Sequence, residues 1–433
     1  MSAEEKSLLP DPNETGTDED HKEKKKKKKS SFRRGVLTGV LTTIAAVAVV
    51  CIIAVTTVFG SDKILSLGTV NKLFKISELI SDSWYKDADT DTLREGLCSG
   101  LVSALGDEYS EYYTPEEAEE EQNLVNANYA GFGALLAQDK TTGATMVRRI
   151  YDNSPASRCG ISVGDTIVSV DGQDTTSMEP ADIAALTRGE EGTTFTLVYA
   201  HDGVNHPVTI TREVIDIPTV SSRMLDSGIG YIAIAQFGDR TDEEFSEALT
   251  DLKNQGMTGV ILDLRDNGGG LVQSSVNMLN DLLPQCKLIT VKSKSGSVEE
   301  IDSDGTGDFD LPIVILMNGN TASASEIFAG SLHDYDKAVL IGEKSYGKGV
   351  IQSQYQLSDG SVVKLTTQEY FLPNGESIQG KGIDPDYTVE YNYSGNAEET
   401  ASRSEEELTN EDYYADSQIK AGYDYLTTGS VQQ

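Results

Sequence analysis

The feature that most constrains this chain is a long uncharged stretch near its start. Residues 35–59 read GVLTGVLTTIAAVAVVCIIAVTTVF and contain no charged side chain. About 20 apolar residues suffice to cross a bilayer as a helix. The stretch therefore predicts a transmembrane helix over 35–59. A cleaved signal peptide is the alternative, although its apolar part would be only about 7–15 residues long and would end at a small-residue cleavage site.

Basic residues lie on one side of this stretch. Lys24 to Lys29, Arg33 and Arg34 precede it, whereas Asp62 and Lys63 are the nearest charges after it. The positive-inside rule then places 1–34 in the cytoplasm as a basic tail and the remainder outside, in a single-pass cell membrane protein. The tail is polar and has no apolar period, so we expect it to be disordered and to touch anionic lipid headgroups.

The rest of the chain is strongly acidic. The formal net charge is -35. The first 60 residues hold ten Lys and Arg against eight Asp and Glu, which leaves +2 there and -37 beyond. Such a surface repels phosphate backbones, so we expect no nucleic-acid partner. A hydrophobic content of 38% is ordinary for globular domains.

The cysteines imply neither a metal site nor a disulfide framework. Cys51 falls within the apolar stretch, which leaves Cys98, Cys159 and Cys286 as an odd set without a C-x-x-C pair. We expect three separate buried thiols; one disulfide among them is the alternative.

The remaining pattern predicts a multidomain protein. Apolar residues recur at helical spacing within 60–123, which favours two or three amphipathic helices. Short strands with glycine turns fill 124–214 and predict a β-rich domain. Strands alternate with helices over 215–393, as in an α/β domain with a largely parallel sheet. The end, 394–433, is an acidic segment with a short helix expected at 418–426.

A serine lies where a strand passes into a helix. NTASASEIFAGSLHDY, residues 320–335, follows the apolar run LPIVILMN. One interpretation of Ser323 and Glu326 is a capping box, in which both side chains satisfy free amides at the helix start. The other is that Ser323 is a nucleophile, because helix amides can stabilise an oxyanion. The two roles are compatible.

No histidine is well placed as the base for such a serine. His21 belongs to the tail, His201 and His206 flank a turn in the β-rich domain, and His333 lies ten residues beyond Ser323 on the same predicted helix. Ten residues of helix span about 15 Å, too far for a hydrogen bond.

A lysine is the alternative base. Lys348 lies in GEKSYGKGVIQSQYQL, residues 342–357, and shares a strand face with Gln352. Burial can lower a lysine pKa toward neutrality, as a general base requires. A solvated lysine in a glycine turn is the plain alternative. A phosphate-binding P-loop is disfavoured because position 349 is glycine and a strand follows.

Two glycine-containing motifs complete the pattern. GVILDLRDNGGGLVQSS, residues 259–275, leaves backbone amides exposed beyond a strand, where a peptide or an oxyanion could approach. SPASRCGISVGDTIVSVDG, residues 154–172, resembles the PDZ consensus. Upstream, Gly131, Phe132 and Gly133 resemble the loop whose amides receive a peptide's terminal carboxylate. The domain acting only as a spacer is the alternative.

Six blocks in order resemble the C-terminal processing peptidases, the tail-specific serine protease family. They are LGDEYSEYYTPEEA, GDTIVSVDG, GVILDLRDNGGGL, TASASEIFAGSL, GEKSYGKGVIQ and SIQGKGIDPD, within 70–387. The resemblance implies a PDZ domain before an α/β protease core and the cleavage of proteins near their C-termini. It implies no metal or cofactor. A homo-oligomer or an activating partner stays open, as does a membrane-tethered PDZ adaptor with an inactive core.

The same resemblance assigns roles to particular residues. It implies that Ser323 is the nucleophile, Lys348 the general base and Gln352 the residue that positions the lysine, while Ser325 and Lys344 are neighbours that do not act. It also implies that the backbone amides of Ala324 and Gly269 form the oxyanion hole. The family usually has proline where this chain has Gly268, which makes the turn looser.

Overall fold

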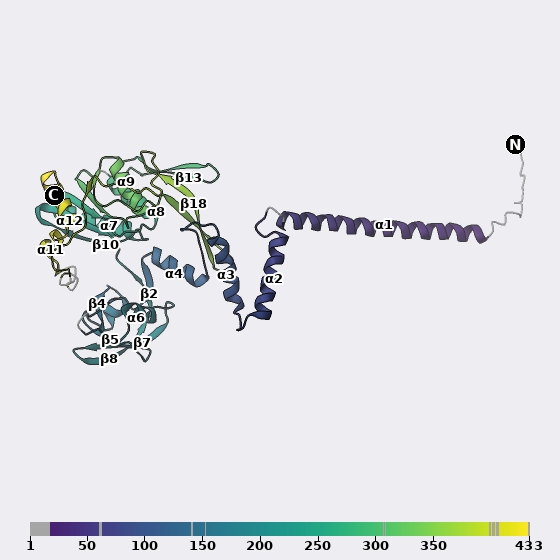
Figure 1. Ribbon diagram of the computed structural model, residues 1–433, viewed down its shortest axis with the longest axis horizontal. Helices are drawn as coiled ribbons and strands as arrows, with labels where there is room; N and C mark the ends of the chain where they lie inside the picture. Colours follow the sequence, from purple (N-terminus) through teal and green to yellow (C-terminus); the bar gives the residue numbers. More distant parts are fainter. Residues whose placement is uncertain are drawn as a thin grey trace, which may run out of the picture. The chain divides into compact units, whose positions relative to one another are not determined.

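The structure is a computed structural model of the chain (Figure 1). It describes residues 18–59, 63–139, 142–151, 153–305, 307, 309–397, 400, 403 and 407–431. The chain divides into two compact units, residues 1–94 and 95–433, each described by itself below.

The first unit begins with one long helix. Helix α1 (Asp18–Phe59) includes all of the predicted span 35–59 and continues toward the N-terminus through the lysine-rich segment. The expectation of disorder is therefore wrong for 18–34, because Lys and Glu are good helix formers; residues 1–17 lie outside the described residues. Within the described chain, one stretch, Ser31–Val50, is long and apolar enough to cross a membrane, a criterion that a signal sequence also meets.

The helices predicted between 60 and 123 are confirmed. They are α2 (Leu67–Ser83), α3 (Thr90–Ser103) and α4 (Pro115–Val125). The Ser66 hydroxyl accepts from the Thr69 amide at the start of α2. A complete capping box of Thr114 and Glu117 starts α4. Helix α2 buries none of its residues.

The β-rich domain is a small sheet of antiparallel neighbours with its own core. Its sheet has the order β3-β4-β5-β7-β8, with β6 beside β5, and β2 pairs separately with β9. Phe132, Ile167, Phe195 and Leu197 are among its fully buried side chains. The strands are β2 (Asn128–Gly131), β3 (Ala134–Gln138), β4 (Thr145–Ile150), β5 (Thr166–Val170), β6 (Gln173–Asp174), β7 (Thr194–His201), β8 (Val204–Thr211) and β9 (Glu213–Asp216), and the helices are α5 (Pro155–Arg158) and α6 (Pro180–Thr187).

The α/β domain contains the predicted, largely parallel sheet. Its order is β10-β11-β12-β15-β16-β19, in which only β10 runs antiparallel to its neighbour. Strands β12 and β15 are buried along their whole length. The strands are β10 (Val220–Met224), β11 (Ile229–Ile234), β12 (Gly259–Asp263), β15 (Ile313–Met317), β16 (Ala338–Gly342) and β19 (Tyr387–Thr388).

A second sheet, which the sequence pattern did not reveal, packs beside the first. Its order is β1-β18-β13-β14, and β17 pairs with the other edge of β18. Strand β1 joins it from far upstream, since Glu111 pairs with Lys364. The strands are β1 (Glu111–Tyr113), β13 (Lys287–Ser293), β14 (Val298–Asp302), β17 (Val350–Gln356) and β18 (Val362–Phe371).

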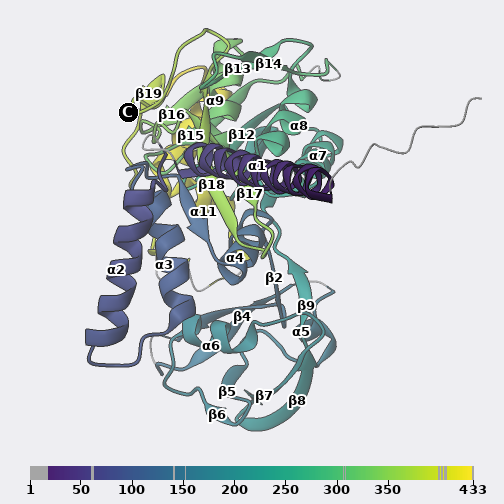
Figure 2. The ribbon, with the colours of Figure 1, turned by 90° about the vertical axis from the view of Figure 1, so that its right-hand side faces the viewer.

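Helices cover both faces of the parallel sheet (Figure 2). On one face lie α7 (Thr241–Asn254), α8 (Val272–Leu282) and α9 (Ala324–Asp334), and their apolar side chains form the larger core. On the other lies α12 (Ser417–Thr428), preceded by α11 (Asn410–Tyr414). The acidic C-terminal segment thus contributes a helix to the α/β domain.

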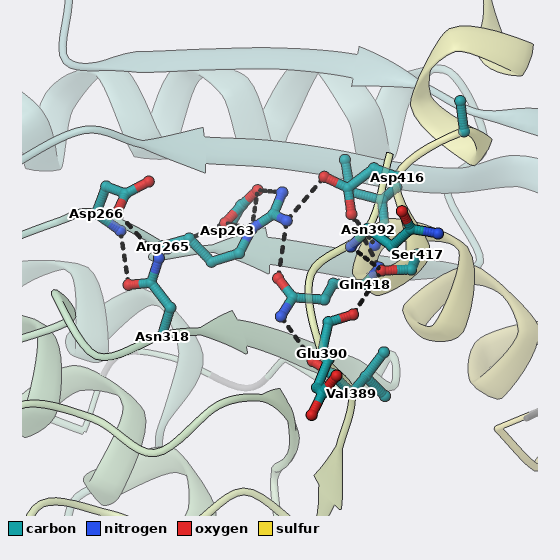
Figure 3. A network of polar contacts seen from close by, with 12 residues as sticks. Asp263, Arg265, Asp266, Asn318, Val389, Glu390, Asn392, Asp416, Ser417 and Gln418 are labelled. Atoms are coloured by element: carbon teal, nitrogen blue, oxygen red, sulfur yellow. Dashed lines mark hydrogen bonds and ion pairs between the residues drawn. The ribbon is translucent and has the colours of Figure 1, made fainter. Parts of the chain in front are cut away.

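A buried ion network fixes α12 to the ends of the strands (Figure 3). Arg265 donates to both carboxylate oxygens of Asp263, at 2.9 Å and 2.6 Å, and at 2.8 Å to Asp416. It also donates to Gln418, at 2.9 Å. Asp416 in turn accepts from the first amides of α12. Each charge has its partners, as burial requires.

Cys98, Cys159 and Cys286 are unpaired, as expected. Cys159 and Cys286 are half-buried, but Cys98 is exposed, so the expectation of burial is wrong there. Cys98 belongs to α3, of which only Val102 is buried.

The packing of α12 predicts that it stabilises the whole domain. Ile419→Ala should lower the free energy of unfolding by about 3 kcal/mol, because it leaves a cavity against the sheet. Thr427→Ala, at an exposed position of the same helix, should change it by less than about 0.5 kcal/mol. Chemical denaturation followed by circular dichroism measures both; equal effects would show that α12 is dispensable.

Candidate active site

Ser323 lies at the junction that the sequence predicts, immediately before α9 and beyond the end of β15. Its backbone is strained, with φ 58° and ψ -118°. A non-glycine residue with positive φ persists only where its surroundings enforce it, and such strain is common at functional sites. A Cβ added to Gly269 would lie 2.8 Å from Ser323 Cβ and 2.7 Å from the carbonyl oxygen of Ala322. The glycine turn therefore lies directly against the serine.

The carboxylate of Glu326 binds both halves of the site. It is fully buried. One of its oxygens accepts from the backbone N–H groups of Ser323, at 2.9 Å, and Lys348, at 2.8 Å. The other accepts from Ser345 Oγ, at 2.6 Å, and the Gly347 N–H, at 2.7 Å. Glu326 thus binds Ser323, as a capping box requires, and also orders the lysine loop.

Tyr370 on β18 joins the same two residues. Its hydroxyl lies 2.8 Å from the carbonyl oxygen of Lys348 and 3.2 Å from that of Ser323. The Ser323 and Lys348 backbones are therefore held together by two side chains, although no hydrogen bond joins Ser323 Oγ to Lys348 Nζ within the described residues.

The glycine turn is shaped by Asn267. This buried side chain donates to the carbonyl of Ile234, at 2.8 Å, and accepts from the Gly269 N–H, at 2.9 Å. Among the described contacts the N–H of Ala324 has no acceptor. Ala324 therefore presents a free amide beside Ser323, whereas the Gly269 amide is already engaged.

Lys348 lies half-buried in the loop before β17. Its pKa is lowered chiefly by burial and further by the positive charge of Lys364, while Glu121, Asp107 and Glu108 act in the opposite direction. Lys364 itself is paired with Glu121 of α4, at 2.5 Å. A lower pKa enlarges the neutral fraction of the amine near pH 7, which is the form that can accept a proton.

The other residues implicated by sequence have different surroundings. Gln352 donates to Thr366 Oγ1, at 3.2 Å, and makes no hydrogen bond to Lys348 among the described contacts. Ser325 is fully buried and donates to the carbonyl of Asn267. Lys344 is exposed and pairs with Asp384.

Three histidines contact other residues. His333 contacts Asp386 at 3.2 Å, His201 contacts Asp165 at 2.6 Å, and His206 stacks on Tyr199. The segment after Lys348 is strand β17, which does not fit the helix that a P-loop requires.

A cavity opens at the same carboxyl edge of the sheet but is not lined by Ser323 or Lys348. Its volume is about 830 Å³, and Asp266, Asn320 and Glu343 are among its lining residues. Ser323 and Lys348 lie beside this cavity, where two strand ends and the loop before β17 meet.

The β-rich domain contains a separate apolar groove between β3 and α6. Its volume is about 210 Å³, and its lining includes Phe132, Leu136 and Ala184. Gly133 is tightly enclosed, since an added Cβ would lie 2.2 Å from Ser154 Cβ. Burial raises the pKa of the Tyr129 phenol, at the edge of this groove, to about 12, while the nearby amides of Gly133 and Ala134 act to lower it.

Sequence reasoning missed several residues of this site. The sequence gives Glu326 only as a cap, and it does not single out Asn267 or Tyr370. The signal available for Glu326 was a carboxylate three residues after the serine in an otherwise apolar helix. Nothing local marks Tyr370, because its role arises from the pairing of β18 with distant strands.

A strained serine at the start of a helix near a half-buried lysine, together with a β-rich domain that has an apolar groove, is the arrangement of a serine peptidase with a PDZ domain. The model of Peptidase family S41 matches residues 228–389, and that of the PDZ domain matches 146–200. The chain belongs to the C-terminal processing peptidases of family S41, as the relatives described next show.

Relatives cover most of the chain. It is 36% identical over 322 residues to the carboxy-terminal processing protease CtpA of Bacillus subtilis (strain 168), covering 74% of this chain and 69% of that protein. It is 33% identical over 356 residues to a CtpA-like serine protease of Staphylococcus aureus (strain COL), covering 80% and 71%. A solved S41 protease structure from Bacteroides fragilis matches with a TM-score of 0.50 at 17% identity, covering 82% of this chain and 97% of that one, and supports the fold alone.

The position of Glu326 predicts a large effect of a small change. In Glu326→Gln an amide N–H₂ replaces one acceptor oxygen and faces backbone donors, so the Ser323 and Lys348 segments should separate. We expect the rate of peptide cleavage to fall by about 10²-fold or more, because small misplacements of reacting groups lower rates by such factors.

Steady-state cleavage of an unstructured peptide measures this effect. The matched control is Glu343→Gln, which changes a neighbouring carboxylate that lines the large cavity, and which should retain its activity. Equal activity of the two variants would contradict the role given to Glu326.

Proposed function

We propose that this protein is a membrane-anchored, extracytoplasmic serine endopeptidase that cleaves proteins near their C-termini with Ser323 as nucleophile and Lys348 as general base. The observation that carries the proposal is the pair of shared anchors: Glu326 binds both backbone amides, and Tyr370 both backbone carbonyls. The two chain segments, which follow the paired strands β15 and β16, are thereby fixed side by side.

The chemistry follows from these two groups. Neutral Lys348 accepts the proton of Ser323 Oγ as the oxygen attacks a peptide carbonyl. The resulting ammonium gives its proton to the leaving amine, and an acyl-enzyme remains. A water molecule, deprotonated by the same lysine, then releases the acid product and restores the serine. No metal or cofactor takes part in these steps.

The oxyanion is stabilised by backbone amides in this proposal. The free N–H of Ala324 supports its assignment as one donor. Gly269 is the second, and it can act only after its N–H leaves Asn267 Oδ1. Substrate binding in the glycine turn would supply that change. Gln352 positions the lysine indirectly at most, through Thr366 on β18.

The PDZ domain binds the substrate's C-terminus in the apolar groove. The loop Gly131, Phe132 and Gly133 receives the terminal carboxylate, and β3 and α6 enclose the last side chain. The size and apolar lining of the groove favour substrates with an apolar C-terminal residue. Substrates are therefore proteins or peptides with free C-termini.

Anchoring and topology rest on the N-terminal helix. The apolar length of α1 and the basic residues before it favour a single-pass protein with a cytoplasmic N-terminus. The proposed substrates are then other envelope or secreted proteins.

The catalytic proposal predicts loss of cleavage without loss of binding. Ser323→Ala and Lys348→Ala in the full chain in detergent should each abolish turnover of an unstructured, apolar-ended peptide. Binding of that peptide, followed by fluorescence anisotropy, should persist. Lys344→Ala is the matched control and should retain activity, since Lys344 is exposed and paired with Asp384. Turnover by Ser323→Ala would refute the proposal.

The PDZ proposal predicts an effect of the Tyr129 hydroxyl. This hydroxyl lies near the Gly133 and Ala134 amides, which act to lower its pKa and which a substrate carboxylate would need. Tyr129→Phe should tighten binding of a peptide with a free C-terminus by about fivefold, the value of one net hydrogen bond. An amidated copy should bind weakly to both forms. Anisotropy titration on the Ser323→Ala background measures the four affinities. Unchanged or weaker binding by Tyr129→Phe would show that the Tyr129 hydroxyl does not compete with the substrate carboxylate for these amides.

A further inference from the structure

Tyr109 covers the proposed catalytic lysine from a distant part of the chain. The centroid of its ring lies 4.7 Å from Lys348 Nζ. Tyr109 belongs to the turn before β1, upstream of the whole PDZ domain. An aromatic ring on an amine takes the place of water that would otherwise solvate it.

The turn that carries Tyr109 is fixed to the protease core. The hydroxyl of Ser110 accepts from the Thr366 N–H of β18, at 3.0 Å, and donates to Asp107, at 2.5 Å. Strand β1 continues this attachment by pairing with β18 from Glu111 to Tyr113. The ring is thus held over the lysine by strand pairing rather than by a free loop.

Tyr109 is itself confined. Burial is the first cause that raises the pKa of its phenol, followed by hydrogen bonds with Glu108 and with Tyr346 of the lysine loop. It stays protonated, so its ring adds no negative charge beside the lysine.

The charged groups around Lys348 do not make up for the water that its amine loses on burial. Lys364 of β18 repels its ammonium form, whereas Glu121 of α4, together with Asp107 and Glu108 of the turn, attracts it. Among the described contacts, the only group of Lys348 that donates to Glu326 of α9 is its backbone N–H. Charges of both signs therefore oppose one another, and burial is the largest influence that favours the neutral amine.

We propose that Tyr109 is a positioning residue that excludes water from the Lys348 amine and so keeps it in the neutral form that catalysis uses. The ring also attracts an ammonium through its π-face, which favours the charged form. Exclusion of water opposes this attraction and outweighs it. The ammonium form loses more free energy when water is removed than it regains from a half-exposed ring. The inference rests on the proposed Ser323 and Lys348 pair.

The test measures the titration of Lys348 without requiring activity. Full-length Ser323→Ala protein in detergent is labelled with trace acetic anhydride across pH 6–11, and the acetylated Lys348 peptide is quantified by mass spectrometry. Adding Tyr109→Ala should raise the midpoint by about one pH unit, since water then reaches the amine. Tyr109→Phe and Tyr109→Leu keep the apolar cover and should leave the midpoint nearly unchanged.

A second arm uses active protein. With Ser323 present, Tyr109→Ala should move the acidic limb of the kcat/KM profile upward by the same amount, lower the rate near pH 7 by about tenfold and leave KM unchanged. Lys344 serves as the internal reference, because its labelling midpoint should be the same in every variant.

The outcomes separate this inference from the proposed function. An unchanged Lys348 midpoint in Tyr109→Ala overturns the inference while the catalytic pair stands. A raised midpoint in a protein whose Lys348→Ala form still cleaves overturns the catalytic role while the shielding stands. Should Tyr109→Ala fail to fold, the comparison of Tyr109→Leu with the parent decides, and a midpoint raised by a full unit despite the apolar cover overturns water exclusion.

Discussion

The buried carboxylate of Glu326 is the contact on which the site depends. Its two oxygens accept four hydrogen bonds from two chain segments, one carrying Ser323 and the other Lys348. Because a buried carboxylate without donors would be costly, these segments are stable only when they meet around it. The same contact holds the strained backbone of Ser323, which an isolated strand-to-helix turn would relax. Ser323, the lysine loop and the start of α9 are therefore one structural unit.

Two sheets supply that unit from different directions. The parallel sheet ends at the glycine turn and Ser323, and the Asp263, Arg265 and Asp416 network fixes the C-terminal helix at the same edge. The antiparallel sheet supplies Tyr370 and supports the lysine loop. The geometry of the proposed site thus depends on the packing of β18 against the larger core, where Tyr370 is fully buried.

Elements that produce a pattern over a short stretch of sequence could be predicted. The strands of the PDZ domain and of the parallel sheet, and the serine at a strand-to-helix junction, follow from alternation and from glycine punctuation. Ser323 and Lys348 could be paired only through the family resemblance, since spacing alone does not separate them from Ser325 and Lys344. The antiparallel sheet escaped prediction because Glu111 and Lys364 are brought together by the fold and by no periodicity. The helical continuation of α1 through the lysine run escaped because composition favours disorder there.

The segment from Tyr109 to the end of α4 connects the proposed site in the α/β domain with the start of the PDZ domain. At one end its tyrosine lies on the Lys348 amine, and within α4 Glu121 pairs with Lys364, the like charge that faces Lys348. At the other end the carbonyls of Leu124 and Val125 accept from Gln236 of the core just before β2 enters the PDZ domain. The proton affinity of the lysine is therefore set partly by residues upstream of the PDZ domain. A displacement of α4 would remove Glu121 from Lys364 and leave a stronger positive charge facing Lys348, so the position of the PDZ linker and the chemistry of the site are coupled through one ion pair.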